Sequence, residues 1–332
     1  MFLSRREFLL IASGGMLSSA KKSSKVIMTI DGPVNADQLG ISLIHEHLLV
    51  DFIGADKIND NRWSRQEVVK KVLPYLQELK QFHVKTFFDC TPAYLGRDVI
   101  LLKMIADKTG LQIVTNTGYY GAGDNKYLPA HANTESAEQL AKRWINEFEK
   151  GIGDSGVKPG FIKIGVGAGP LSALHKKLVV AAAITRRATG LAICSHTGPA
   201  IPALDEIELL QQNGVDARGF VWVHAQAEQD KNNHKKAAGA GAWISLDGIG
   251  WGDFENYTDS IEKLQQANLL HRVLISHDAG WYKPGEPDGG TFCGYTNIFT
   301  QLIPLLKNKG FTETDIEQLL IKNPIEAFAI PG

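Results

Sequence analysis

The feature that most constrains the fold is a repeated alternation of short apolar runs with longer amphipathic stretches. Runs rich in β-branched residues predict strands, and apolar residues at helical spacing predict helices. The amphipathic stretches include 65–82, 138–150, 176–189 and 260–267. The expected strands are 42–47, 86–90, 112–118, 161–165, 191–196, 220–225, 242–247 and 273–278. Strands that alternate with helices predict a parallel sheet.

Eight such units in about 300 residues predict a single α/β domain, a (β/α)8 TIM barrel. We expect it to span residues 26–330. The competing fold is an open, doubly wound sheet. No expected strand is followed by G-x-G-x-x-G or by a P-loop, which disfavours a nucleotide-binding sheet and a nicotinamide-dependent oxidoreductase.

The first residues, 1–22, are interpreted as an export signal. The pair Arg5 and Arg6 precedes a short apolar stretch that contains Gly14 and Gly15. This start is similar to a twin-arginine signal, which implies a periplasmic or otherwise exported protein. No later segment reaches the roughly 18 uncharged apolar residues of a membrane span, so we expect no stable membrane insertion.

Charge and cysteine content exclude several other classes of protein. The 35 Lys and Arg residues balance 36 Asp and Glu residues, for a formal net charge of −1. No basic field is available to attract nucleic acid, so no nucleic-acid partner is expected. The expected partner is a small-molecule substrate of the strand-end site described below. Cys90, Cys194 and Cys293 are too few and too scattered for a disulfide framework or a zinc ribbon.

The first expected strand ends in two candidate metal ligands. Side chains alternate along a strand, so His45 and His47 share one face and Glu46 points the other way. An H-x-H pattern is a weak signal by itself. The later strands strengthen it.

Lys163 lies in the middle of the apolar fourth strand. If Ile162 and Ile164 pack against the outer helices, Phe161 and Lys163 face the interior of the barrel. Burial lowers the pKa of a lysine, and a neutral amine beside metal ions can take up carbon dioxide as a carbamate.

The fifth, sixth and eighth strands end at His196, His224 and Asp278. Active sites of barrel enzymes lie at these C-terminal strand ends. We interpret the other histidines as ordinary polar residues and Cys194 as a core residue.

The ordered set H-x-H, Lys, His, His and Asp resembles the amidohydrolase superfamily. The surrounding motifs resemble its phosphotriesterase-related family over most of the chain, from about Val26 to Phe328. They are 43–48 (LIHEHL), 117–120 (TGYY), 160–164 (GFIKI), 275–278 (ISHD) and the closing Asn323-Pro324.

This resemblance implies a binuclear metal site. His45, His47 and Asp278 would bind the more buried metal, His196 and His224 the more exposed one, and carboxylated Lys163 would bridge them. Zinc is the expected metal, with manganese, cobalt and iron as alternatives. Two such cations lower the pKa of a bridging water and polarise the carbonyl or phosphoryl oxygen of the substrate, and the resulting hydroxide attacks the carbon or phosphorus atom. Asp278 is the expected proton acceptor, and a homodimer is expected by resemblance alone.

Departures from the family bear on the substrate. Ala227 and Gln229 stand where organophosphate hydrolases carry aspartates, and Gly248 stands where they have histidine and the related lactonases arginine. A lactone or carboxylic ester, sugar-derived compounds included, is therefore favoured over an organophosphate triester. An N-acyl amide remains an alternative, and a non-catalytic binding protein on the same barrel is a remote one. Asp247 is interpreted as a structural carboxylate.

Several loop residues are candidate substrate contacts. Aromatic rings suit sugar rings, lactones and aryl esters, and Lys283 suits an anionic group. The Gly- and Pro-rich segment 280–294 is typical of a mobile lid. The predicted substrate-binding residues are Tyr119, Tyr120, Gln226, Trp251, Trp281, Tyr282 and Lys283.

Overall fold

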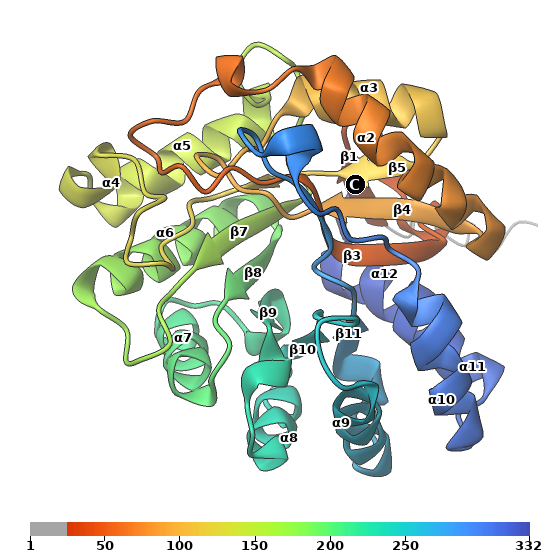
Figure 1. Cartoon of the computed structure of the whole chain (residues 1–332). Coiled ribbons are helices and arrows are strands. Elements are labelled where there is room, and N and C mark those ends of the chain that lie inside the picture. Colours follow the sequence, from red (N-terminus) through yellow and green to blue (C-terminus); the bar gives the residue numbers. More distant parts are fainter. Residues whose placement is uncertain (1–24) are drawn as a thin grey trace, which may run out of the picture.

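Parallel strands surrounded by helices form the centre of the protein in this computed structural model, which describes residues 25–332 (Figure 1). The strands pair in the orders β12-β3-β4-β5 and β6-β7-β8-β9-β10-β11. Only Thr115 separates β5 from β6, so these two strands are halves of one. The barrel strands are β3 (Ile41–Leu49), β4 (Val84–Asp89), β5 (Gln112–Val114), β6 (Asn116–Thr117), β7 (Phe161–Gly165), β8 (Ala192–His196), β9 (Phe220–Val223), β10 (Trp243–Leu246) and β11 (Val273–Ile275).

The barrel closes between its first and last strands. The backbone N–H of Asp278 donates to the carbonyl of His45 at 3.0 Å, and the N–H of His45 donates to Ser276 Oγ at 2.9 Å. The short strand β12 (Gly280–Tyr282) then pairs with β3 in parallel. The predicted (β/α)8 barrel is confirmed, and the signal expected over 1–22 lies outside the described residues.

Helices follow the strands in turn and cover the outside of the barrel (Figure 1). Gly110 and Gly190 end two of them in the left-handed conformation, with φ of 75° and 79°, which glycine adopts at little cost. No helix among residues 25–332 has both the length and the apolar character needed to cross a membrane. The helices are α2 (Arg65–Glu78), α3 (Val99–Thr109), α4 (His131–Thr134), α5 (Ala137–Lys150), α6 (Ala173–Thr189), α7 (Ala200–Gln212), α8 (Lys231–Gly239), α9 (Phe254–Gln266), α10 (Ile303–Asn308), α11 (Glu313–Glu317) and α12 (Asn323–Phe328).

Alternation of side chains divides the core into an outer and an inner part. On β7, Ile162 and Ile164 pack in the larger cluster between strands and helices. Phe161 belongs to the inner cluster, and Lys163 lines a cavity at the upper end of the barrel. The strand therefore has the orientation that its apolar residues predicted.

An antiparallel sheet closes the N-terminal end of the barrel. Its strands are β1 (Lys25–Thr29), β2 (Gly32–Asn35) and β13 (Ile330–Pro331), in the order β13-β1-β2. Ile27 and Phe328 pack into the inner cluster, where the Phe328 ring lies 4.6 Å from that of Phe88. The barrel interior is thus filled at this end, and the cavity lies at the other.

A β-bulge in β3 sets the orientation of the H-x-H residues. Leu43 pairs with Phe87 and Glu46 with Asp89, so β3 contains one residue more than β4 between these two pairs. Leu43 packs outside and Ile44 inside, while His45 also lines the inner cavity. The extra residue of a bulge changes the direction of the side chains that follow it and leaves one residue of the strand unpaired.

Candidate metal centre

The six residues with predicted ligand roles line one cavity of about 90 Å³ at the C-terminal ends of the strands. His45 and His47 come from β3, Lys163 from β7 and His196 from the end of β8. His224 follows β9 directly, and Asp278 follows β11 after two residues. His45, His224 and Asp278 offer ligand atoms that all lie within 4.8 Å of one another.

Asp278 and Lys163 lie close to the Nε2 atoms of the first two histidines. Asp278 Oδ1 is 3.0 Å from His47 Nε2 and 3.6 Å from His45 Nε2. Lys163 Nζ is 3.3 Å from His45 Nε2, and the ring centroids of His196 and His224 are 4.4 Å apart. The groups thus form one continuous cluster.

Hydrogen bonds at Nδ1 fix the orientation of three of the histidines. His45 Nδ1 donates to Asp247 Oδ2 at 3.1 Å, and His224 Nδ1 donates to Asp247 Oδ1 at 2.7 Å. His47 Nδ1 lies 2.8 Å from Thr91 Oγ1, whose proton is directed to the carbonyl of Leu49. With the proton held at Nδ1, the lone pair of Nε2 is free to bind a metal.

Asp247 therefore does more than satisfy nearby backbone groups. It accepts the N–H of His224, as a structural carboxylate would, but it also orients His45 and His224. Thr91 has the equivalent role for His47. The only sequence signal for either residue is its position just beyond the end of a barrel strand.

The backbone is strained at the site. His224 and Asp278 have φ of 61° and 51°, in the left-handed region that non-glycine residues rarely adopt. Trp281, on the cavity wall, has φ of 73°. Such conformations persist where the surrounding structure enforces them, and they gather at functional sites.

Burial and neighbouring charges shift the pKa values of the histidines and of Asp278 in different directions. Burial, aided by the charge of Lys163, lowers the pKa of His45 to about 4, and burial lowers the pKa of His196 well below its usual range. Burial opposes ionisation of Asp278, but the neighbouring histidines hold its pKa at about 2. For His224, burial is the largest single influence and lowers the pKa, but the charge and hydrogen bond of Asp247 together with the charge of Asp278 outweigh it and raise the pKa.

The donor set fits divalent metal ions. Imidazole nitrogens and carboxylate oxygens are the ligands that zinc and similar ions bind. Lys163 is 2% exposed, and among residues 25–332 its amine forms no ion pair, which is costly for a buried charge. The same six residues therefore provide both the ligands and an uncompensated buried amine beside them.

Apolar and aromatic side chains form the rest of the cavity wall. An arc of rings leads from the rim to a candidate ligand: Trp251 and Trp281 are 5.6 Å apart, Trp281 and Phe52 5.5 Å, Phe52 and Tyr127 5.9 Å, Tyr127 and Tyr120 5.8 Å, and Tyr120 and His196 5.0 Å. Sequence reasoning missed Phe52, which follows β3 with no pattern to distinguish it. The apolar and aromatic lining residues are Val50, Phe52, Cys90, Pro92, Leu95, Tyr120 and Trp281.

The predicted substrate contacts divide into two groups. Tyr120 and Trp281 line the cavity, and Trp251 is 55% exposed at its rim. The structure does not bring Tyr119 to the cavity, because consecutive side chains face opposite ways; its hydroxyl lies 3.1 Å from His131 Nε2. Gln226 is bonded to Asp247 and does not line the cavity either.

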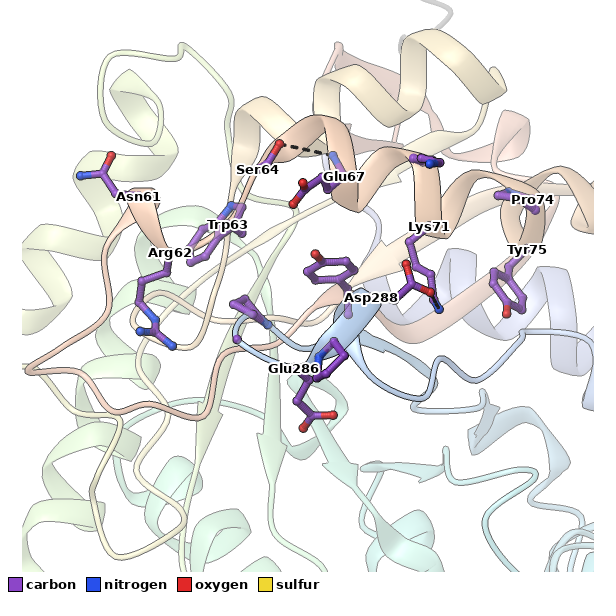
Figure 2. A pocket seen from close by; sticks show the side chains of 15 residues that line it. Asn61, Arg62, Trp63, Ser64, Glu67, Lys71, Pro74, Tyr75, Glu286 and Asp288 are labelled. Carbon is purple, nitrogen blue, oxygen red and sulfur yellow. Dashed lines mark hydrogen bonds and ion pairs between the residues drawn. The ribbon is translucent and has the colours of Figure 1, made fainter.

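Tyr282 and Lys283 also lie away from the metal cavity. Tyr282 faces a separate hollow of about 1130 Å³ between α2 and the loop that contains Glu286 and Asp288 (Figure 2). Lys283 lies 3.8 Å from Glu286. β12 pairs with β3, and Lys71 forms a 2.7 Å ion pair with Asp288; the mobile lid expected over 280–294 stays a prediction.

Comparison with known proteins agrees with this geometry. The model of the phosphotriesterase family matches residues 25–328. The phosphotriesterase homology protein of Escherichia coli is 30% identical over 296 residues, covering 88% of this chain and 99% of its own. The N-acetyltaurine hydrolase of Mus musculus is 27% identical, over 90% of this chain and 96% of its own.

A solved structure supports the same fold. The organophosphorus hydrolase from Deinococcus radiodurans superimposes with a TM-score of 0.83 at 24% identity, covering 93% of this chain and 98% of its own. The resemblance first indicated by the strand-end motifs is confirmed. The chain therefore belongs to the phosphotriesterase family, whose members are binuclear metal hydrolases of the amidohydrolase superfamily.

Proposed function

We propose that this member of the family hydrolyses neutral lactones or carboxylic esters. The observation that carries the proposal is the lining of the metal cavity, which apart from the six candidate ligands is apolar or aromatic. Among residues 25–332, Lys163, in the candidate ligand cluster, is the only lysine or arginine on that wall. A substrate with a neutral, apolar flank is therefore the best match.

The candidate ligand roles carry over in the same form as the sequence suggested. His45, His47 and Asp278 would hold one ion, His196 and His224 the other, and Lys163, as a carbamate, would bridge them. Conversion to a carbamate removes the positive charge and adds oxygen ligands, which relieves the unpaired buried amine. Bound divalent ions, zinc foremost, would supply Lewis-acid activation of the carbonyl and a nucleophilic hydroxide.

The protein's own residues then hold the substrate and move the proton. Asp278 uses Oδ1 toward His47, so its Oδ2 is available to accept a proton during attack. Asp247 and Thr91 keep the Nδ1 protons of the histidines in place. Tyr120, Phe52 and Trp281 exclude water from the cavity and flank the substrate.

Two alternatives differ in what they require of the site. An N-acyl amide with an anionic group, such as the substrate named for the mouse relative, needs a cation, and Lys283 lies away from the cavity. The organophosphate hydrolases and the related lactonases both carry a side chain at position 248, so Gly248 separates this chain from both, and the apolar lining of the cavity carries the preference for a neutral ester. A Cβ there would lie 2.6 Å from Gln226 Nε2, so the space for that side chain is occupied.

The test is a matched substrate panel on the zinc-loaded protein. We expect alkyl and aryl lactones or esters to be turned over faster than carboxylate-bearing lactones of the same ring, N-acetyltaurine and an organophosphate triester. Trp281→Ala should raise KM most for the substrates with the largest apolar flank. Preference for the anionic compounds or for the triester would contradict the proposal.

A further inference from the structure

Gln226 lies in the turn that directly follows a candidate metal ligand. It is the central residue of the 3-10 turn Ala225–Ala227, and His224 before it adopts the left-handed conformation. That reversal carries the half-buried side chain of Gln226 back to the end of the neighbouring strand β10. There the Gln226 amide contacts Asp247, which is hydrogen-bonded to two candidate metal ligands, His45 and His224.

Both ends of the Gln226 amide bond to Asp247. Gln226 Oε1 accepts the backbone N–H of Asp247 at 3.2 Å, and Nε2 donates to Asp247 Oδ1 at 3.3 Å. These two bonds hold the backbone and the carboxylate of Asp247 together. No other side chain among the described residues bonds both of these groups.

Asp247 has little freedom once all of its donors are in place. Its carboxylate is fully buried and accepts from His45 Nδ1, His224 Nδ1, the His224 N–H and Ser245 Oγ as well as from Gln226. A rotation of this carboxylate would change the direction of both histidine rings. The bond from Gln226 to Oδ1 opposes such a rotation from the outer side.

Gly248 leaves the space that Gln226 occupies. A Cβ at position 248 would lie 2.6 Å from Gln226 Nε2 and 2.8 Å from Tyr257 Oη. Tyr257 Oη donates to the carbonyl of Gly248 at 2.5 Å, so it has little room to withdraw. Any side chain at position 248 therefore displaces Gln226.

We propose that Gln226 is a positioning residue, which holds Asp247 and through it the His45 and His224 rings, and that glycine at position 248 is required to make room for it. The two residues act as one unit. The inference needs only a metal-dependent hydrolase and is independent of whether the substrate is a lactone or an ester.

Gln226→Met tests the role with little change in side-chain volume, because it removes both hydrogen bonds. Loss of a group that supports metal ligands typically costs roughly tenfold to a hundredfold in metal affinity or activity. We expect a fall of that size in zinc retention against a competing chelator, and a fall in kcat with little change in KM. Gln229→Met, in an exposed glutamine three residues later, should behave as wild type.

Gly248→Ala should reproduce the loss. In a Tyr257→Phe background, which removes the second close contact of that Cβ, the double variant Gln226→Ala/Gly248→Ala should be no worse than Gln226→Ala, because the two substitutions then act through one contact. The urea unfolding midpoint of the metal-free variants separates this role from a general loss of stability. The proposal would be overturned if Gln226→Met retained zinc and turned over substrate as well as wild type does. Additive losses in the double variant would overturn it too. Zinc retention is measured without substrate, so it tests the role of Gln226 even if the protein does not hydrolyse lactones or esters.

Discussion

Glu46 and His277 are in contact across the seam of the barrel, with 2.7 Å between Oε1 and Nδ1 and both side chains fully buried. Glu46 also accepts the backbone N–H groups of His277 and Ala279, each at 3.0 Å, and the hydroxyl of Ser276 at 2.8 Å. The residue between the two histidines of the H-x-H pattern thus fastens the first strand to the last one.

Glu46→Ala should destabilise the protein strongly, because several buried donors lose their only shared acceptor. Removing one partner of a buried polar pair costs about 3–5 kcal/mol. We expect the free energy of unfolding in urea to fall by about that amount, and less in Glu46→Gln, whose amide oxygen still accepts. Glu78→Ala, in an exposed position on α2, is the control. Equal stability of Glu46→Ala and Glu78→Ala would refute the fastening role.

Asp278→Asn should nearly abolish turnover and leave the barrel folded. The variant keeps the shape of the side chain but removes the charge beside His45 and His47 and the proton acceptor. We expect kcat to fall by roughly a hundredfold or more, as for other general-base losses. Kinetics with the best substrate of the panel and near-ultraviolet circular dichroism measure both parts. Turnover close to that of wild type with a bound metal would remove Asp278 from the mechanism.

Lys163→Ala should lose the bridged metal pair together with activity. The side chain is buried beside His45, and no other residue of the described part of the chain carries an amine on the cavity wall. We expect the zinc content to drop from two ions per chain and turnover to disappear, while the circular dichroism spectrum stays unchanged. Lys236→Ala, at an exposed position on α8, should keep both. Full activity in Lys163→Ala would contradict the assignment of a binuclear site bridged by Lys163.

Glu206 should make stability depend on pH. It is fully buried, 2.5 Å from Ser195 Oγ and 2.7 Å from Thr197 Oγ1, and burial raises its pKa to about 8. An unfolded glutamate has a pKa near 4.3, so from about pH 4.3 to about 8 the folded state keeps a proton that the unfolded chain has lost. Stability therefore falls as the pH rises through this window.

Glu206→Gln removes that dependence. The difference in unfolding free energy between Glu206→Gln and wild type should grow in favour of the variant, by up to about 1.4 kcal/mol for each pH unit within the window. Urea unfolding at several pH values measures it. Glu208→Gln, exposed on the same helix, should show no such trend; parallel pH profiles for all three proteins would mean that Glu206 does not titrate in this range.

The sequence predicted the barrel well because strand and helix periods are local properties. Each expected strand overlaps an observed one, and Ile162 and Ile164 correctly oriented Lys163. The bulge in β3 was not predictable, because it depends on the register with β4. Strict alternation would have put Leu43 on the same face as His45, whereas Leu43 packs outside.

Loop positions were harder to predict than strand ends. Tyr119 and Tyr120 are indistinguishable in sequence, yet only Tyr120 reaches the cavity. Phe52 and Thr91 gain their roles from contacts with segments far along the chain. Gly248 was visible as a departure from the family, but its link to Gln226 depends on space between two turns, which only the folded structure defines.

The seam also sets an order of events during synthesis. His45 and His47 leave the ribosome before Asp278 and the groups that Glu46 binds, which all lie within residues 276–279. A chain that stops short of them has an open barrel and an incomplete ligand set. Metal capture can therefore be complete only after residues 276–279 have been made, even though the first two candidate ligands precede them in the chain.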